Sequence, residues 1–100
     1  MPKIIFQINY DIKPETRENY LSTIKELQYH ITNNSDKTYM VMEDKNKMNN
    51  FTEMYICNNE EEYDNLEANV DDKTFELTNK LFTDFIQDKK VNYSTHYEID

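Results

Sequence analysis

The sequence predicts an α+β protein in which helices cover one face of a four-stranded antiparallel sheet. Four short segments carry apolar residues at every second position, which is typical of half-buried strands. The segments between them carry apolar residues at every third or fourth position, which is typical of amphipathic helices. The resulting order β-α-β-β-α-β is that of the ferredoxin-like class, and two right-handed crossovers then place the first and third strands at the centre of the sheet.

The chain begins with a predicted strand and a long helix. The strand, Lys3 to Asp11, is expected to have one side in the core, formed by Ile4, Phe6, Ile8 and Tyr10. Its other side, formed by Ile5, Gln7 and Asn9, is mixed in polarity and points away from the core. Pro14 suits the first turn of the next helix, where its missing N–H group costs nothing. That helix carries one apolar stripe and is expected to end at Asn33-Asn34-Ser35: Tyr20, Leu21, Ile24, Leu27 and Ile31.

A hairpin is predicted after this helix. Its strands are Lys37 to Glu43 and Phe51 to Cys57, and the polar segment Asp44 to Asn49 connects them. Alternation places Glu53 and Tyr55 on the same side of the second of these strands. The chain has no glycine, so turns that need a positive φ angle are expected at asparagine or aspartate.

The second helical region is predicted to consist of two pieces. Asn59 and Glu62 have the spacing of a capping box at the start of a short helix. One of the adjacent aspartates Asp71-Asp72 is expected to cap the second piece, whose apolar side is broad: Leu77, Leu81, Phe82, Phe85 and Ile86. A turn at Asp88-Lys89-Lys90 then leads into the last predicted strand, Val91 to Ile99.

Length and composition favour a single domain over residues 1 to 100. The net charge of −9 would repel a phosphate backbone, so nucleic-acid binding is not expected. No apolar run approaches the length of a membrane span, and residues 1 to 13 lack the continuous apolar core of a signal peptide. The single cysteine, Cys57, fits a reducing compartment. We therefore expect a cytoplasmic protein without membrane association.

The face of the sheet that the helices leave bare needs a cover of its own. Each set of side chains that could form this face contains Met, Tyr or Ile beside its polar residues. A face exposed to water would be mostly polar at its alternating positions. We therefore expect a homodimer in which the sheets of two copies face each other, forming a dimeric α/β barrel. The alternative is an open, half-polar face with scattered aromatic residues.

Two stretches of the sequence resemble the dimeric α/β-barrel superfamily, whose commonest small members are antibiotic-biosynthesis-monooxygenase-like domains. One stretch is the strand, acidic turn and helix FTEMYICNNEEEYDNL, which contains Glu53 and Tyr55, and the other is the opening IIFQINYDIKPETRENYLSTIKEL. The resemblance implies this fold from Ile4 to Ile99. It also implies a cofactor-free monooxygenase if the family's activity is retained.

The chain departs from that family in the residues that carry its chemistry. Family members commonly have a His in the short helix after the acidic turn and often a Trp on the third strand. This chain has Asn65, Glu67 and Asn69 in that helix, and it has no Trp. Asn9 resembles the Asn of the haem-degrading branch, but the His and Trp that accompany it there are missing. Haem oxygenase activity is therefore not expected.

The candidate ligand-pocket residues are polar or amphipathic side chains that the strands could present to a cavity: Gln7, Asn9, Glu53, Tyr55, Tyr93, His96 and Tyr97. The alternative for the tyrosines is packing in the core or an interface with the hydroxyl in water. His96 and Glu98 alone make an incomplete metal site, and the acidic segment Glu60 to Asp72 lacks the ligand pattern of an EF-hand. Cys57 has acidic neighbours, which disfavour a thiolate. We expect no metal and no cofactor.

Three classes of function follow from these observations. The favoured class is a non-catalytic or small-ligand-binding homodimer whose ligand is hydrophobic or aromatic, because the family's reactive side chains are absent. The second class is a cofactor-independent monooxygenase acting on a small aromatic substrate, although an interior lined by acids would oppose a substrate anion. The third class is an interaction module whose acidic helices bind a basic protein.

Overall fold

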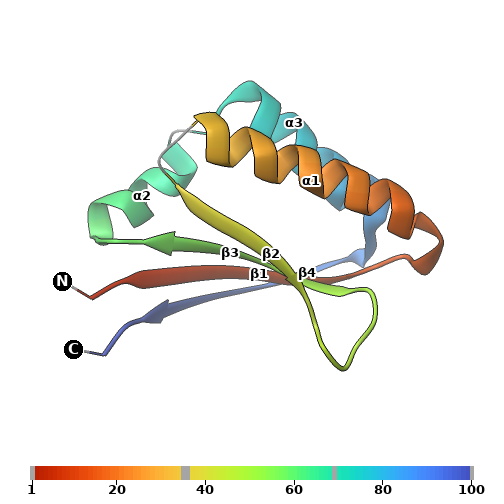
Figure 1. The fold of residues 1–100 in the computed structure, drawn as a ribbon, viewed down its shortest axis with the longest axis horizontal. Coiled ribbons are helices and arrows are strands. Elements are labelled where there is room, and N and C mark those ends of the chain that lie inside the picture. Colours follow the sequence, from red (N-terminus) through yellow and green to blue (C-terminus); the bar gives the residue numbers. More distant parts are fainter. Residues whose placement is uncertain (1, 35–36, 69, 100) are drawn as a thin grey trace.

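The computed structural model describes residues 2–34, 37–68 and 70–99. The chain forms the predicted ferredoxin-like arrangement, an antiparallel four-stranded sheet in the order β2-β3-β1-β4 with helices on one face (Figure 1). The strands are β1 (Ile4–Ile12), β2 (Thr38–Glu43), β3 (Asn50–Cys57) and β4 (Ile86–Tyr97). The helices are α1 (Arg17–Asn34), α2 (Glu60–Ala68) and α3 (Asp72–Lys80), with a 3₁₀ turn at Pro14–Thr16 and a π-helical turn at Leu81–Phe85.

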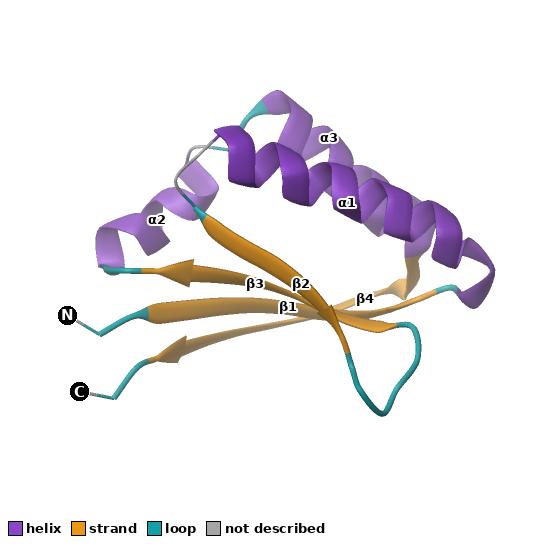
Figure 2. Ribbon diagram, viewed as in Figure 1, coloured by secondary structure: helices purple, strands orange, loops and turns teal. Residues whose placement is uncertain are grey.

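The molecule has two layers. Figure 2 shows α1 and α3 above the strands, where they contact each other, and α2 over the end of the sheet near the two termini. The first and third strands are central, as predicted. No helix among the described residues combines the length and the apolar character that crossing a membrane would require.

Helix α1 begins and packs as its sequence predicts. Pro14 opens the preceding 3₁₀ turn, in which the Thr16 N–H group donates to the Lys13 carbonyl oxygen at 2.9 Å. The predicted apolar stripe is buried apart from the partly buried Leu21, and it packs against both the sheet and α3. The helix extends to Asn34, while Ser35, where we expected it to end, lies outside the described residues.

The β2–β3 hairpin is tied to the start of α1. The Arg17 guanidinium donates to both oxygens of Glu43 at 2.6 and 2.9 Å, and the Asn49 N–H group donates to the same carboxylate at 2.8 Å. The Arg17 hydrogen bond, followed by that of Asn49, lowers the pKa of Glu43 to about 2. Asn49 has a φ angle of 67°, so one of the predicted asparagine or aspartate positions does take the left-handed conformation.

The second helical region is split in two, as predicted. The Asn59 side chain accepts from the Glu62 N–H group at 2.9 Å and caps α2, but the Glu62 carboxylate bonds to the Asn58 N–H group instead of completing a capping box with Asn59. Asp71 caps α3 by accepting from the Thr74 N–H group at 2.8 Å. The hydrogen bond from Thr74 is also the main reason that the pKa of Asp71 falls to about 2.

The last strand differs from the prediction at both ends. We expected Val91 to Ile99, whereas β4 covers Ile86–Tyr97 and Ile99 is 90% exposed. Ile86 pairs with Ile12 on β1, and the register then shifts so that the residues at 87–90 bulge out before Val91 pairs with Tyr10. The predicted turn residues lie in this bulge, where Asp88 and Lys89 have φ angles of 55° and 53°. Lys89 contradicts the expectation that positive φ angles fall on asparagine or aspartate, because the bulge needs a second positive φ angle directly after Asp88.

Replacing Lys89 with glycine should stabilise the protein. A non-glycine residue in the left-handed region costs about 1–2 kcal/mol, and the entropic cost of glycine offsets only part of that relief. We expect Lys89→Gly to raise the free energy of unfolding by about 0.5–1 kcal/mol, as measured by urea denaturation. Lys90→Gly is the matched control, since the φ angle of Lys90 is not positive and the glycine should therefore destabilise. Equal destabilisation by both variants would contradict the strain argument.

Candidate functional site

A hollow of about 280 Å³ lies between the helix-facing side of the sheet and the helices α2 and α3. Most of its wall is aromatic or aliphatic: Phe6, Ile8, Tyr10, Tyr55, Leu66, Val70, Phe75, Leu81, Phe82, Ile86, Val91 and Tyr93. Thr74, Thr78 and Glu53 complete the lining. A concave, mainly apolar site with a few polar groups is the usual form of a small-molecule pocket.

The hollow exists because the second helical region covers its part of the sheet incompletely. Phe6 and Ile8 were predicted to be core residues with Ile4 and Tyr10, yet only the latter two are fully buried. Phe75 of α3 is 63% exposed and Phe82 is 40% exposed, so the helical side of the hollow is itself open to solvent. The apolar face of β1 is therefore partly core and partly pocket wall.

Aromatic rings form one wall of the hollow. The Phe6 ring stacks on Tyr93 with centroids 6.0 Å apart and an interplanar angle of 8°, and on Tyr55 with centroids 6.4 Å apart. The Tyr63 ring from α2, which is outside the lining of the hollow, meets Phe6 edge-on at 6.3 Å. Tyr93 is 66% exposed at the outer strand of the sheet, so this wall extends from the interior to the surface.

Glu53, in the middle of β3, is the charged group of this site. Its carboxyl group is buried and 6% of the residue is exposed. The Tyr39 hydroxyl donates to Glu53 Oε1 at 2.6 Å, and the Tyr10 hydroxyl donates to Oε2 at 2.6 Å. The Tyr20 hydroxyl of α1 lies 2.8 Å from that of Tyr10, and it is the donor whenever the single proton of Tyr10 points at an ionised Glu53. Side chains from β1, β2 and α1 thus converge on one carboxyl group.

The electrostatics of this cluster follow from its burial. Burial raises the pKa of Glu53 because it disfavours the charged carboxylate, while the hydrogen bonds from Tyr10 and Tyr39 act in the opposite direction. Burial, and after it the neighbouring Glu53 charge, raise the pKa values of Tyr10, Tyr39 and Tyr55. The tyrosine hydroxyls therefore remain protonated donors over the whole physiological range.

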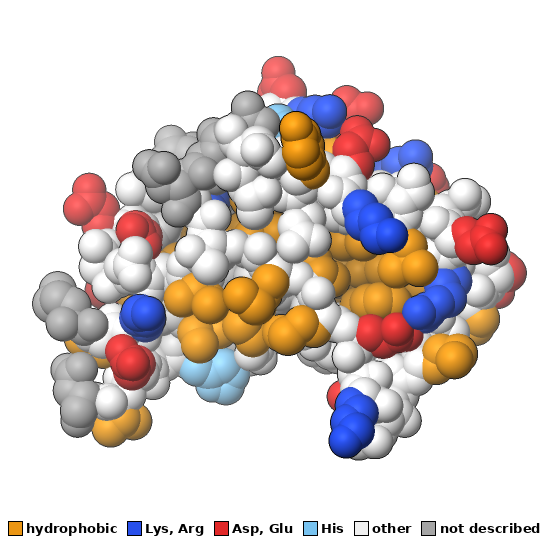
Figure 3. Space-filling view, viewed as in Figure 1, with side chains coloured by type: hydrophobic (Ala, Val, Ile, Leu, Met, Phe, Trp, Pro, Cys, Tyr) orange, Lys and Arg blue, Asp and Glu red, His pale blue; other side chains and the backbone are white. Residues whose placement is uncertain are grey.

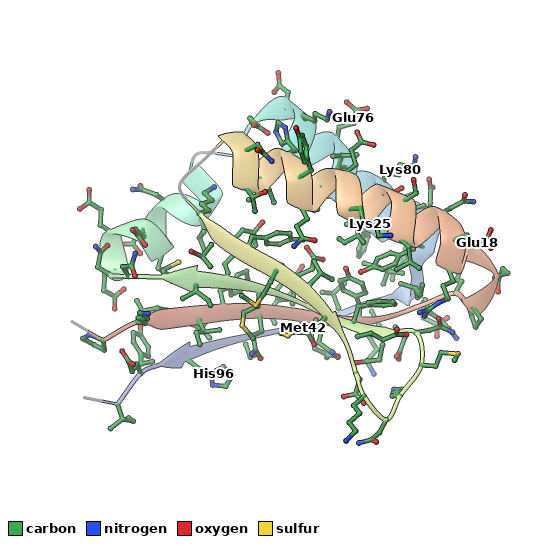
Figure 4. All side chains as sticks on the ribbon, in the orientation of Figure 1. Glu18, Lys25, Met42, Glu76, Lys80 and His96 are labelled. Atoms are coloured by element: carbon green, nitrogen blue, oxygen red, sulfur yellow. The ribbon has the colours of Figure 1, made fainter. Side chains whose placement is uncertain are left out.

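The structure divides the predicted site residues between the two faces of the sheet, so they do not share one pocket. Glu53, Tyr55 and Tyr93 line the hollow. Tyr97 is on the same side of β4 but outside the hollow, and the Glu60 charge raises the pKa of its phenol. The other three are on the opposite face, because they pair with residues whose side chains point away from the helices: Gln7, Asn9 and His96. Figure 4 shows His96 extending from the side of the sheet away from the helices.

Asn9 is engaged within the open face of the sheet. Its Nδ2 group donates to Asn50 Oδ1 at 2.9 Å, to Thr52 Oγ1 at 3.0 Å and to the Phe51 carbonyl oxygen at 3.2 Å. These contacts hold β1 and β3 together on the side opposite the hollow. Asn9 does not line the hollow.

Sequence reasoning missed the three tyrosines that surround Glu53. The sequence pattern places Tyr10 and Tyr20 in the core, and Tyr39 falls within the predicted strand Lys37 to Glu43 with nothing to indicate its partner. The sequence signal for these donors is Glu53, which shares one side of its strand with Phe51 and Cys57. A carboxyl group in an apolar layer requires hydrogen-bond donors nearby. Which tyrosines supply them depends on the strand register.

Among the described residues, the other reactive side chains are not gathered into a metal site. Within the described residues, no three His, Cys, Asp or Glu side chains lie close enough together to hold a metal ion. Cys57 is buried, and burial followed by the Glu62 charge raises the pKa of its thiol, which disfavours a nucleophilic thiolate.

Comparisons with known proteins identify the fold. No protein-family model matches the chain, and a sequence search of curated proteins gives no match. Among solved structures, a conserved protein from Methanosarcina mazei Go1 is similar, with a TM-score of 0.79, 18% identity, and coverage of 96% of this chain and 92% of that one. A protein described as an antibiotic biosynthesis monooxygenase matches over 100% of both chains with a TM-score of 0.74 and 18% identity. The chain has an antibiotic biosynthesis monooxygenase-like fold.

One further similar structure is described as a dimer. A dimeric ferredoxin-like protein from an uncultured marine organism matches this chain with a TM-score of 0.59 and 13% identity, covering 100% of this chain and 90% of that one. At these identities the likeness concerns the fold.

Removing the Glu53 charge should stabilise the protein increasingly as pH rises. An unfolded glutamate titrates near about pH 4.3, and the raised pKa of folded Glu53 means that the folded state holds this proton more tightly. The contribution of Glu53 to stability is therefore full below the unfolded pKa and is lost as pH rises through the folded pKa. We expect the unfolding free energy of Glu53→Gln, relative to that of the wild type, to increase as the pH rises above the unfolded pKa toward the raised folded pKa.

Urea denaturation at fixed protein concentration measures this difference. Glu18→Gln on the outer surface of α1 is the control. The difference between its unfolding free energy and that of the wild type should not rise with pH in the same way. If the unfolding free energy of Glu53→Gln instead falls progressively below that of the wild type as the pH rises, the ionised carboxylate stabilises the folded protein and the expectation is wrong.

Proposed function

We propose that this protein is a homodimer in which each chain binds a small apolar or aromatic molecule in the hollow between its sheet and its helices. The observation that carries this proposal is the hollow itself, an aromatic-lined space around Glu53 beneath α2 and α3. An apolar cavity of about 150 Å³ suffices to bind benzene in another protein. A space of about 280 Å³ has room for one aromatic ring with a short substituent.

The composition of the open sheet face supports a second copy as its cover. The register places these residues on that face: Ile5, Gln7, Asn9, Asp11, Thr38, Met40, Met42, Asn50, Thr52, Met54, Ile56, Asn92, Ser94 and His96. Apart from His96, Asp11 is the only charged residue among them, although 31% of the chain is Asp, Glu, Lys or Arg. Figure 3 shows hydrophobic side chains gathered over the strands beneath α1, with charged side chains mainly over helices and loops.

Depletion of charge with enrichment of Met distinguishes the centre of a protein interface from ordinary surface. The similar structure described as a dimeric ferredoxin-like protein is consistent with such an assembly. A two-fold axis through the open face would place both hollows on the outside of the dimer, since the helices lie on the other face.

Ligand binding ranks above oxygenation for a chemical reason. Cofactor-free oxygenation of a phenol needs an environment that stabilises the substrate anion, and the hollow contains a carboxyl group and no cationic side chain among its described lining residues. An acidic interaction module ranks lower because several acidic side chains already have partners within the chain. Glu62 and Asp71 engage helix ends, and Glu43 binds Arg17.

Ligand binding can be tested with 2-phenylethanol as a neutral aromatic probe. We expect it to raise the thermal unfolding midpoint saturably, since a ligand at about 100 times its Kd adds about 2.7 kcal/mol to stability. Thr78→Trp should abolish the rise, because Thr78 lines the hollow from an exposed position and the indole would fill it. Thr83→Trp is the control, since Thr83 is exposed and outside the lining. Failure of the wild type to respond would refute binding of this ligand class.

The dimer can be tested by placing a charge on the open face. Met54 lies on the central strand β3, so Met54→Lys would bury an unpaired ammonium group between the two sheets. We expect wild type to sediment as a dimer at micromolar concentration and Met54→Lys as a monomer with an unchanged circular dichroism spectrum. Tyr29→Lys, at an exposed position on α1, should remain dimeric. A wild-type monomer throughout the micromolar range would contradict the assembly.

A further inference from the structure

We propose that the ligand of the hollow is an organic cation, an ammonium group on a small aromatic or aliphatic body, whose charge pairs with Glu53. This inference rests on the proposed function, because it names the class of ligand for the same hollow. It follows from the charge balance around Glu53, the free acceptor positions of its carboxylate, and the rings beside it.

Glu53 is a buried acid whose partners are all neutral. Its oxygens accept hydrogen bonds from the Tyr10 and Tyr39 hydroxyls. The ion pairs among the described residues do not include it: Arg17–Glu43, His30–Asp71, Lys47–Asp11 and Lys73–Glu26. Buried charges in proteins are normally paired, and a carboxylate in an apolar layer without a cation is costly. A cationic ligand would supply the charge that the chain lacks at this point.

The carboxylate retains the capacity to bind such a ligand. Each carboxylate oxygen can accept about two hydrogen bonds, and each receives one from a tyrosine. The two hydroxyls also fix the orientation of the carboxylate, so a ligand would not have to pay for ordering it. Of the described residues that line the hollow, Glu53 alone carries a formal charge, so an ammonium group there meets no competing cation.

The aromatic wall suits a cation as well as an apolar body. Tyrosine and phenylalanine faces attract ammonium groups within about 6 Å of the ring centroid. Phe6, Tyr55 and Tyr93 place three such rings in the lining of the hollow. The electrostatic field of the whole protein also favours a cationic ligand, because a net charge of −9 raises the local concentration of cations and lowers that of anions.

Three probes of similar shape separate the possibilities: 2-phenylethylamine, 2-phenylethanol and phenylacetate, which are cationic, neutral and anionic at neutral pH. Isothermal titration calorimetry on the wild-type protein would give their affinities. We expect the amine to bind about ten- to a hundred-fold more tightly than the alcohol, as for a hydrogen bond made to a charged group, and phenylacetate to bind most weakly.

Glu53→Gln is the decisive variant. The amide keeps the shape and a hydrogen-bonding oxygen but removes the charge, so the amine should lose its advantage over the alcohol. Glu18→Gln removes the same charge from the outer surface of α1 and should leave the preference intact. This control separates contact with Glu53 from the general attraction of an acidic protein.

A second measurement covers the case in which Glu53→Gln does not fold. Lowering the pH protonates Glu53, so the preference of the wild type for the amine should disappear while binding of the alcohol persists. The titratable groups packed around Glu53 are Tyr10, Tyr20, Tyr39 and Tyr55, from β1, α1, β2 and β3. All four stay protonated in acid. Repeating the titration at high salt screens the surface carboxylates that also take up protons, so the change that persists there would report Glu53.

The outcomes separate this inference from the proposed function. Equal binding of amine and alcohol would overturn the cation assignment and leave ligand binding in place. An amine preference that survives in Glu53→Gln would also overturn it, because the acidic surface would then be the cause. Failure of all three probes to bind would refute both the proposed function and this inference.

Discussion

Burial of the Glu53 carboxyl group is the constraint on which the rest of this structure depends. A carboxyl group at the centre of an apolar layer must be hydrogen-bonded, and here the donors come from β1, β2 and, through Tyr10, from α1. Three core positions around it are tyrosines, and the Tyr10–Tyr20 contact links this cluster to α1. The same requirement directs Tyr10, Tyr20 and Tyr39 inward. The helices that follow β3 cover the remaining part of this face of the sheet.

Much of the fold could be predicted because the local signals agree with the global arrangement. Apolar alternation located the strands, Pro14 and Asp71 marked helix starts, and the element order specified the sheet. The end of the chain was harder to predict, because the start of β4 depends on Ile86 pairing with Ile12 across the sheet. A local reading of Asp88-Lys89-Lys90 correctly indicated a turn but could not indicate that the strand had already begun.

The site was less predictable than the fold for two physical reasons. Residues that alternate along separate strands share a face only once the register is known, so Asn9 and Glu53 could not be assigned to opposite sides from sequence alone. The hollow itself depends on how far α2 and α3 stand away from the sheet, which the apolar stripe of a helix does not encode. Glu53, Tyr55 and Tyr93 were singled out by chemistry, and their grouping emerged from the packing.

The bulge in β4 also bears on how the protein stays dispersed. β4 is an outer strand of 12 residues without proline, and the free amide and carbonyl groups of such a strand form a template for fibril growth. The residues at 87–90 interrupt that template, and they bring Lys89 and Lys90 to the border of the sheet. Bulges and edge lysines oppose pairing between strand edges, so the two unfavourable backbone conformations at Asp88 and Lys89 would also disfavour aggregation through β4.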